Sequence, residues 1–250
     1  MADDDRSFEY FLEVYGTLPR AGPGGDDHTR RALDSVPVEA ATVLDLGCGP
    51  GRQTLVLADA LPGAEIRAID VLPSMVDEAN RRFRNANLGH RVRAEVGNMA
   101  APSVEPGTQD LVWAEGSIYN LGVTEALTAW QPLLRPGGGV AFTEVVWLAE
   151  PPDELREWWT AEYPAISDAV GVVDRIRAAA FDLVDSFVLP ASAWWDEYYT
   201  PMRSRIDALR QQHSDDATAA AVADAATREI AMFERFWDFY SYAFFITQPA

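Results

Sequence analysis

The stretch VLDLGCGPG, from Val43 to Gly51, decides the fold, because it places three glycines and a proline directly after a short apolar run. Glycine loses more conformational entropy on folding than any other residue, so this cluster indicates that the bare backbone is needed. The following RQTLVLADAL has helical periodicity, which predicts a strand, a glycine turn and a helix. Such a turn can hold a dinucleotide, a nucleoside triphosphate or another nucleoside cofactor, or it can be purely structural.

Strand and helix patterns alternate from this turn to about residue 150. We expect strands at residues 42–47, 65–70, 92–97, 110–116 and 140–146, the last one after a proline-glycine turn. Helical patterns between them predict a parallel, doubly wound α/β sheet. Right-handed crossovers place the ligand at the carboxyl ends of these strands.

After Pro151 the sequence changes character. Two aromatic clusters, EWWTAEYP and WWDEYYTPM, flank a helix and the strand-like FDLVDSFVLP. An alanine-rich helix over roughly 215–239 and a final strand at YAFFIT follow. We expect one domain over residues 1–250. Its predicted parts are an N-terminal helix and lid at 1–35, a cofactor-binding core at 36–150, and a C-terminal part at 151–250 with helical insertions that cap the substrate.

The lid prediction rests on GTLPRAGPGG, from Gly16 to Gly25, whose glycines and prolines break the first helix. This loop, with Arg20 in it, is interpreted as a cover over the cofactor, and the alternative is a surface connector.

Composition limits the classes of partner. The net charge of −19 argues against nucleic acid and against an anionic membrane surface, so a small-molecule substrate fits better. No apolar run approaches the roughly 18 residues of a membrane span, and the acidic N-terminus is unlike a signal peptide, so we expect a cytoplasmic protein. A single cysteine, Cys48, and three scattered histidines indicate neither a disulfide nor a metal site. The sequence leaves open whether the protein forms a homodimer.

The glycine spacing narrows the ligand. Gly47-x-Gly49-x-Gly51 is shorter than the dinucleotide fingerprint and lacks the lysine of a triphosphate-binding loop. We expect its backbone N–H groups and the next helix N-terminus to face a single carboxylate. Asp70 ends the second predicted strand, where an acid can accept both hydroxyls of a ribose. Together, the glycine spacing and Asp70 predict a nucleoside ligand without phosphates. S-adenosylmethionine fits that description.

VLDLGCGPGRQT followed by IRAIDVLPSMVDEA resembles the first two motifs of the class I S-adenosylmethionine-dependent methyltransferases, and LLRPGGGVAFTE resembles that family's turn into its fifth strand. RAGPGG, WAEGSIYNLG and FTEVVW are similar to a bacterial subgroup of small-molecule type. The resemblance implies a Rossmann-like fold with a mostly parallel seven-stranded sheet. It also implies metal-free methyl transfer to an O, N or C nucleophile, with S-adenosylhomocysteine as product.

The resemblance also implies site residues. The expected cofactor contacts run along the first four strand ends: Asp45, Gly47, Gly49 and Gly51, Asp70 for the ribose, Leu72 or Met75 together with Asn98 and Met99 for the adenine, and Glu115. Tyr15 is added to them as part of the predicted lid.

Glu115 and Glu144 follow or end apolar strands, so each is a candidate base or ammonium-binding acid. A solvated or helix-capping acid is the alternative. Tyr119 and Asn120 are candidates for positioning the substrate, Tyr119 being included among the catalytic residues.

Trp147, Trp158 and Trp194 are expected over the same edge, where an aromatic box would suit a flat or cationic acceptor. Core packing is the alternative for these side chains. The N-methyltransferase pattern [DN]-P-P-[YF] is absent after the fourth strand, where AEGS stands, which weakens a nucleobase or glutamine acceptor. Transfer of another group from a similar donor, or cofactor binding without catalysis, are the alternative functions.

Overall fold

The computed structural model describes residues 2–250 and is built around β1 (Thr42–Leu46). This strand is apolar on both faces, with Val43 in one buried cluster and Leu44 in another, as a central strand requires. It pairs in parallel with β2 (Glu65–Asp70) on one side and β4 (Gln109–Ala114) on the other. The chain therefore reverses its direction of winding between β1 and β4, which makes their carboxyl ends the switch point.

The sheet confirms the predicted α/β fold with a mostly parallel sheet. Its order is β3-β2-β1-β4-β5-β8-β7, with β1 to β5 parallel and β8 antiparallel to both of its neighbours. The remaining strands are β3 (Val92–Val96), β5 (Leu134–Trp147), β6 (Ser167–Asp168), β7 (Phe181–Val188) and β8 (Tyr240–Pro249). The two-residue β6, which pairs with β5, was not predicted because two residues show no periodicity.

The predicted turn before the fifth strand is wrong, because β5 already begins at Leu134 and includes the segment RPGGG. A side chain at Gly138 or Gly139 would press on backbone oxygens of β4 or β8 at 3.0–3.1 Å. The glycines thus let neighbouring strands approach closely, and a shift in pairing register between Gln109 and Leu111 absorbs the extra residues.

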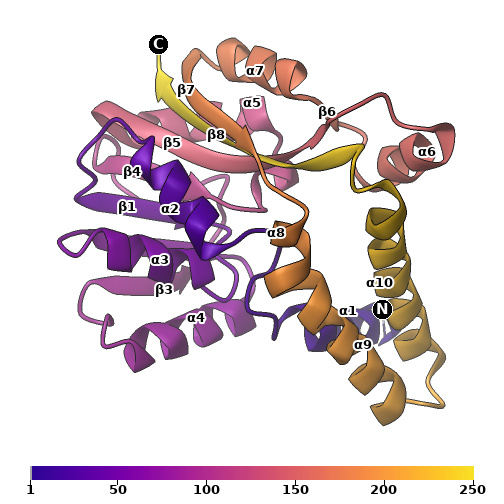
Figure 1. Ribbon diagram of the computed structural model, residues 1–250. Coiled ribbons are helices and arrows are strands. Elements are labelled where there is room, and N and C mark those ends of the chain that lie inside the picture. The colour runs from indigo at the N-terminus through magenta and orange to yellow at the C-terminus, as the bar shows by residue number, and fades with distance from the viewer. Residues whose placement is uncertain (1) are drawn as a thin grey trace.

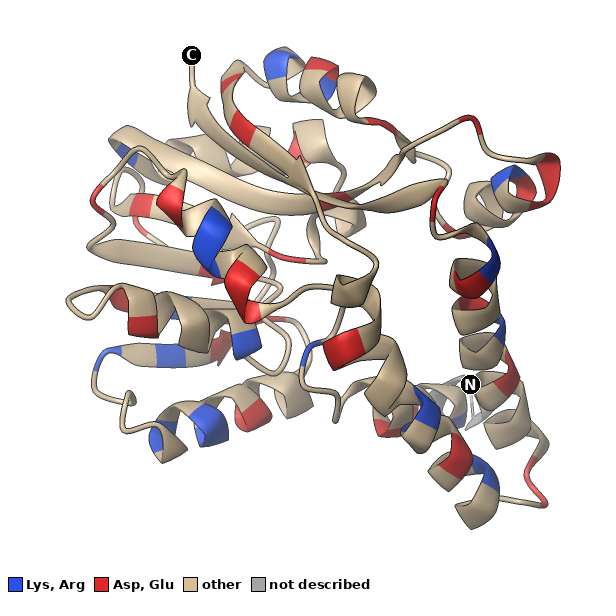
Figure 2. Ribbon diagram, in the orientation of Figure 1, with Lys and Arg blue, Asp and Glu red and all other residues tan. Residues whose placement is uncertain are grey.

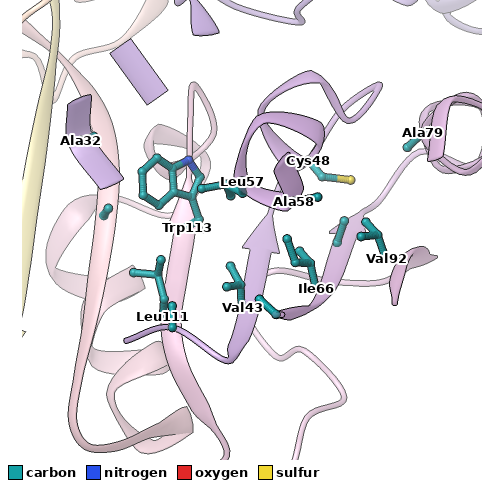
Figure 3. Close-up of a cluster of buried hydrophobic side chains, with 14 of the residues drawn as sticks. Ala32, Val43, Cys48, Leu57, Ala58, Ile66, Ala79, Val92, Leu111 and Trp113 are labelled. Atoms are coloured by element: carbon teal, nitrogen blue, oxygen red, sulfur yellow. The ribbon is translucent and has the colours of Figure 1, made fainter. Parts of the chain in front are cut away.

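Helices cover both faces of the sheet (Figure 1). On one face lie α2 (Asp26–Asp34), α3 (Arg52–Ala60) and α4 (Pro73–Asn85), and on the other lie α5 (Val123–Trp130) and α7 (Ala169–Ala178). Figure 3 shows Trp113 of β4 beside Leu57 of α3, with Val43 and Ile66 from the neighbouring strands below.

The third buried cluster belongs to a group of helices beyond the carboxyl ends of the strands, which we call the helical cap (Figure 1). It consists of α1 (Ala2–Tyr15), α6 (Asp153–Glu162), α8 (Ser192–Trp194), α9 (Thr200–Gln212) and α10 (Ala217–Phe236), with a π-helix, η3 (Trp195–Tyr199), between α8 and α9. Two short 3-10 helices, η1 (Ile118–Asn120) and η2 (Gln131–Leu133), flank α5. α10 matches the predicted alanine-rich helix to within three residues at each end.

Charged residues lie mainly on helices and loops, and the acidic ones are spread over many elements instead of gathering at one place (Figure 2). This distribution fits a solvated acidic surface. None of the helices in residues 2–250 combines the length and the apolar character that crossing a bilayer requires.

Candidate active site

A cavity of about 1040 Å³ lies where the strand ends meet the helical cap. Loops after β1, β2 and β3 line one side, which we call the cofactor half. The helical cap and residues of β5, η1 and β8 line the other side, which we call the aromatic half because Tyr and Trp are its commonest side chains. Pockets for small ligands span about 300–1,000 Å³, so this cavity is at the upper end of that range.

The glycine turn approaches the loop after β4 very closely. Gly47 has φ +72°, and a Cβ on it would overlap the side chain of Ser117. The hydroxyl of Ser117 in turn donates to the carbonyl of Leu46 at 2.7 Å. Glycine is therefore required at 47 both by its left-handed backbone and by this contact.

The expectation that the turn offers its N–H groups to a ligand is wrong. The N–H groups of Gly47 and Cys48 both donate to the carbonyl of Ile69, at 2.8 and 3.0 Å. The N–H of Gly49 donates to Asp70 Oδ2 at 2.8 Å. The parallel strand β2 ends directly beside the turn, so its last acceptors take these donors. What the turn supplies is an open surface without side chains.

Asp45 and Gly51 do not line the cavity, which corrects their prediction as cofactor contacts. Asp45 is buried beneath the turn, where it accepts from Thr54 Oγ1 at 2.5 Å, and burial raises its pKa to about 7. Gly51 packs against Phe83 of α4, which leaves no room for a side chain. Both residues hold the turn in place from behind.

The other predicted cofactor residues gather in the cofactor half: Gly47, Gly49, Asp70, Leu72, Met75, Asn98 and Met99. Asp70 is oriented by two backbone N–H groups, from Gly49 to Oδ2 and from Leu72 to Oδ1 at 2.9 Å. Asn98 Oδ1 accepts from the N–H of Ala100 at 2.8 Å, so the amide nitrogen is the group that remains to donate.

Glu115 lies at the cavity but does not fit the predicted role of a base. Its Oε1 accepts from Trp113 Nε1 and Thr29 Oγ1, both at 2.8 Å, and its Oε2 accepts from Arg20 at 3.0 Å. Arg20 is 3% exposed and also binds Asp26 and Glu197. Both oxygens of Glu115 are therefore occupied, and its ion pair with Arg20 holds the loop at 16–25 in place.

That loop borders the cavity. Residues 20–23 line it, and the N–H of Gly24 donates to the carbonyl of Ala193 at 2.9 Å. Ala21 lies so close to Gly49 that a Cβ there would come within 3.1 Å of its side chain. The loop therefore contacts the glycine turn, the helical cap and the segment after β4.

Glu144 of β5 is 1% exposed, and its Oε2 has no hydrogen-bond partner. Its Oε1 accepts from the N–H of Val145 at 3.2 Å, and burial raises its pKa to about 7. Glu144 itself does not line the cavity. Tyr119 and Tyr163, which do line it, are in edge-to-face contact with ring centroids 6.1 Å apart, and the buried hydroxyl of Tyr163 also lacks a partner.

The predicted substrate residues divide into two groups. Asn120, Trp158 and Trp194 line the cavity, whereas Trp147 does not. Trp147 packs edge-to-face on Trp159 and Tyr240, each with ring centroids 6.4 Å away, and these two rings line the cavity where Trp147 does not.

Tyr15 lies in the aromatic half, where its hydroxyl donates to Glu229 Oε2 at 2.9 Å. Glu229 of α10 was missed by the sequence analysis. One feature of the sequence could have identified it: Glu229 is an acid within the stripe of Ala226, Ile230 and Phe233, which the helix buries. A helix that only covers a core carries apolar residues along such a stripe. Tyr198 and Tyr199 were also missed as cavity residues, because an aromatic cluster by itself does not show which rings face a cavity. No cluster of three or more metal-ligating side chains occurs in the part of the chain that the structure describes.

Residues 43–138 match the methyltransferase domain family. Trans-aconitate 2-methyltransferase from Paracidovorax citrulli is 35% identical over 190 residues, which cover 72% of this chain and 71% of that protein. Malonyl-[acyl-carrier protein] O-methyltransferase from Enterobacter lignolyticus is 32% identical over 157 residues, 59% of each chain. A Geobacter sulfurreducens methyltransferase crystallised with S-adenosylhomocysteine has the same fold, with a TM-score of 0.85 at 18% identity over 97% of this chain and 98% of that one.

The chain belongs to the class I S-adenosylmethionine-dependent methyltransferases. The cofactor half of this methyltransferase fits S-adenosylmethionine on its own geometry. Gly47 and Gly49 of the turn line the cavity without side chains, and an oriented carboxylate stands beside them at Asp70. No lysine occurs anywhere in the chain to meet a polyphosphate.

Replacing Gly47 with alanine tests the glycine turn. Overpacking costs roughly 1–3 kcal/mol, so we expect Gly47→Ala to lower the melting temperature and to weaken S-adenosylhomocysteine binding about tenfold or more in calorimetry. Gly107 is the matched control, because it also has a positive φ, of +69°, but nothing within 4 Å of a Cβ. Gly107→Ala should leave binding unchanged. If Gly47→Ala bound S-adenosylhomocysteine as tightly as the wild type, the need for glycine beside Ser117 would be contradicted.

A second experiment tests the buried ion pair between Arg20 and Glu115. Breaking a buried pair costs roughly 3–5 kcal/mol because a charge remains uncompensated, so Arg20→Met should strongly destabilise the protein in urea unfolding. The double variant Arg20→Met, Glu115→Gln should recover part of that loss. Arg30→Met, which breaks the exposed pair with Asp59, is the control and should change stability little. Equal effects of Arg20→Met and Arg30→Met would show that the buried pair is unimportant.

Proposed function

We propose that this enzyme transfers the methyl group of S-adenosylmethionine to a nucleophile of a small organic molecule bound in the aromatic half of the cavity. The observation that carries the proposal is that one cavity joins the glycine turn and Asp70 to a wall of aromatic side chains. The net charge of −19 weighs against a nucleic-acid acceptor.

In the cofactor half, Asp70 binds the ribose, since each of its oxygens accepts one backbone hydrogen bond and keeps capacity for a hydroxyl. Leu72, Met75 and Met99 pack against the adenine, and Asn98 donates to its edge. Gly47 and Gly49 leave space for the methionine portion.

S-adenosylmethionine, when bound, supplies a methyl group that its sulfonium already activates. The residues of the chain have to align the acceptor behind it, and such positioning can supply roughly 7–11 kcal/mol. Tyr119, Asn120, Trp158 and Trp194 do this from the aromatic half, and the loop at 16–25 excludes water.

Glu144 takes up the proton of the acceptor. Its unpartnered Oε2 and its pKa of about 7 are the properties of a base that works near neutral pH. Glu144 does not line the cavity, so the proton has to pass through Tyr163, which lines the cavity and whose side chain lies near enough to Glu144 to lower its pKa against the effect of burial. For this transfer the Tyr163 hydroxyl has to turn onto Oε2 of Glu144, which then takes its proton while Tyr163 takes the proton of the acceptor.

The acceptor can be found with S-adenosylmethionine labelled in its methyl group, incubated with the enzyme and a metabolite extract. We expect a labelled product whose mass exceeds that of its precursor by one methylene unit. A product with another mass gain would contradict methyl transfer, and failure to bind S-adenosylhomocysteine would contradict the cofactor assignment.

Glu144→Gln tests the base with the acceptor found in this way. We expect kcat to fall by about 10²–10⁴-fold, while S-adenosylhomocysteine binding is unchanged. The wild-type rate should rise with pH through about 7 as Glu144 loses its proton, and the variant should lack this rise. An unchanged rate in Glu144→Gln would refute the assignment, and Glu154→Gln on the surface of α6 is the control.

Stability gives an independent readout of the same group. The pKa of Glu144 in the folded protein, about 7, lies above its ordinary value of 4.5, so the folded state binds the extra proton. The contribution of Glu144 to the free energy of unfolding should therefore be greatest below pH 4.5 and should decline as pH rises through 7. Glu144→Gln should remove that part of the decline in thermal unfolding.

A further inference from the structure

Glu229 forms a polar centre in the wall of the aromatic half. Its Oε2 accepts from the hydroxyl of Tyr15 at 2.9 Å, and its Oε1 accepts from the hydroxyl of Tyr198 at 3.1 Å. Burial raises the pKa of Glu229, and hydrogen bonds from the surrounding tyrosines oppose that rise. All three of these side chains line the cavity.

These hydrogen bonds fix the polarity of the wall. A tyrosine hydroxyl has one hydrogen, and Tyr15 and Tyr198 use theirs on Glu229, so each presents lone pairs to a ligand. The carboxylate itself is an acceptor. A ligand group that contacts this part of the wall must therefore be a donor, and a ligand carboxylate would meet acceptors alone.

The charges around the cavity have the same bias. Glu162 and Glu229 are the carboxylates that line the aromatic half. Arg20 is already bound to three carboxylates, so it is not available to a ligand. Arg228 is the other cation on the described lining, and its side chain is largely exposed to solvent. A polyanionic acceptor would need several cations and finds one exposed guanidinium.

The rest of the wall is aromatic. Trp194 stacks on Phe233 with ring centroids 4.5 Å apart and packs against Tyr199 at 5.8 Å, which keeps these rings fixed. The faces of such rings attract cations and pack well against flat, apolar molecules. The π-helix η3 supplies Tyr198 and Tyr199 from adjacent positions, and irregular helical turns of this kind occur frequently at functional sites.

We propose that the acceptor carries a protonated amine on an aromatic or apolar scaffold, and that Glu229 binds this amine. The inference rests on the proposed function, because it names the class of substrate for the same cavity. The amine is the group by which the acceptor is recognised.

Calorimetry with a pair of probes tests the proposal on the enzyme saturated with S-adenosylhomocysteine. Tryptamine and indole-3-propionate share a ring system and carry opposite charges, and trans-aconitate is the third probe. We expect tryptamine to bind roughly tenfold or more tightly than either acid, as a charge-assisted hydrogen bond provides. Tighter binding of an acid, or no binding of tryptamine at millimolar concentration, would overturn the proposal.

Variants locate the effect. Glu229→Gln should remove the preference for tryptamine, whereas Glu234→Gln, on the exposed side of the same helix, should keep it. Tyr15→Phe removes one hydrogen-bond donor from Glu229 and leaves the charge of Glu229 in place, so it should lower the preference for tryptamine less. This variant replaces Glu229→Gln in the test if Glu229→Gln does not fold. A preference that survives both substitutions would overturn the role of Glu229. Binding of S-adenosylhomocysteine, measured first for each variant, separates this outcome from a failure of the proposed function.

Discussion

Arg20 joins three carboxylates from separate parts of the chain: Glu115 after β4, Asp26 of α2 and Glu197 of η3. A guanidinium that is 3% exposed is stable only when it is fully paired, so these segments must come together in one arrangement. The loop that carries Arg20 is thereby held against the cavity. Its contact with the glycine turn and the approach of Tyr198 to the cavity depend on the same cluster, since Glu197 directly precedes Tyr198.

The glycine turn has a different role from the one its composition first indicates. Its N–H groups are used within the protein, by Ile69 and Asp70, so the turn does not hold a ligand by donating to it. It provides space, and it orients Asp70 through the N–H of Gly49. The same contacts explain why the turn and the end of β2 act as one unit: each satisfies polar groups that the other leaves at a strand end.

The two halves of the cavity differ in how they are made. The cofactor half consists of loops at the ends of parallel strands, where the topology of the sheet brings β1, β2 and β3 together. The aromatic half comes largely from the helical cap, whose elements are far apart in the sequence. The side chains proposed to select the acceptor, such as Glu229 and Tyr15, are brought together by α10 and α1 across more than 200 residues. The acidic and aromatic character of this half is a property of the assembled cap.

The sequence by itself determined the sheet, the cofactor and most residues of the cofactor half, because β1, its glycine turn and Asp70 are close in the chain and have fixed spacing. It identified Glu115 and Glu144 as the acids at the strand ends but gave both the same candidate role. Only the tertiary structure decided that Arg20 engages Glu115 and that Oε2 of Glu144 has no partner. It also decided that Trp147 lies behind other rings and that Glu229 faces the cavity. The physical reason is that hydrogen-bonding and burial of a side chain depend on partners distant in the chain, which local periodicity does not encode.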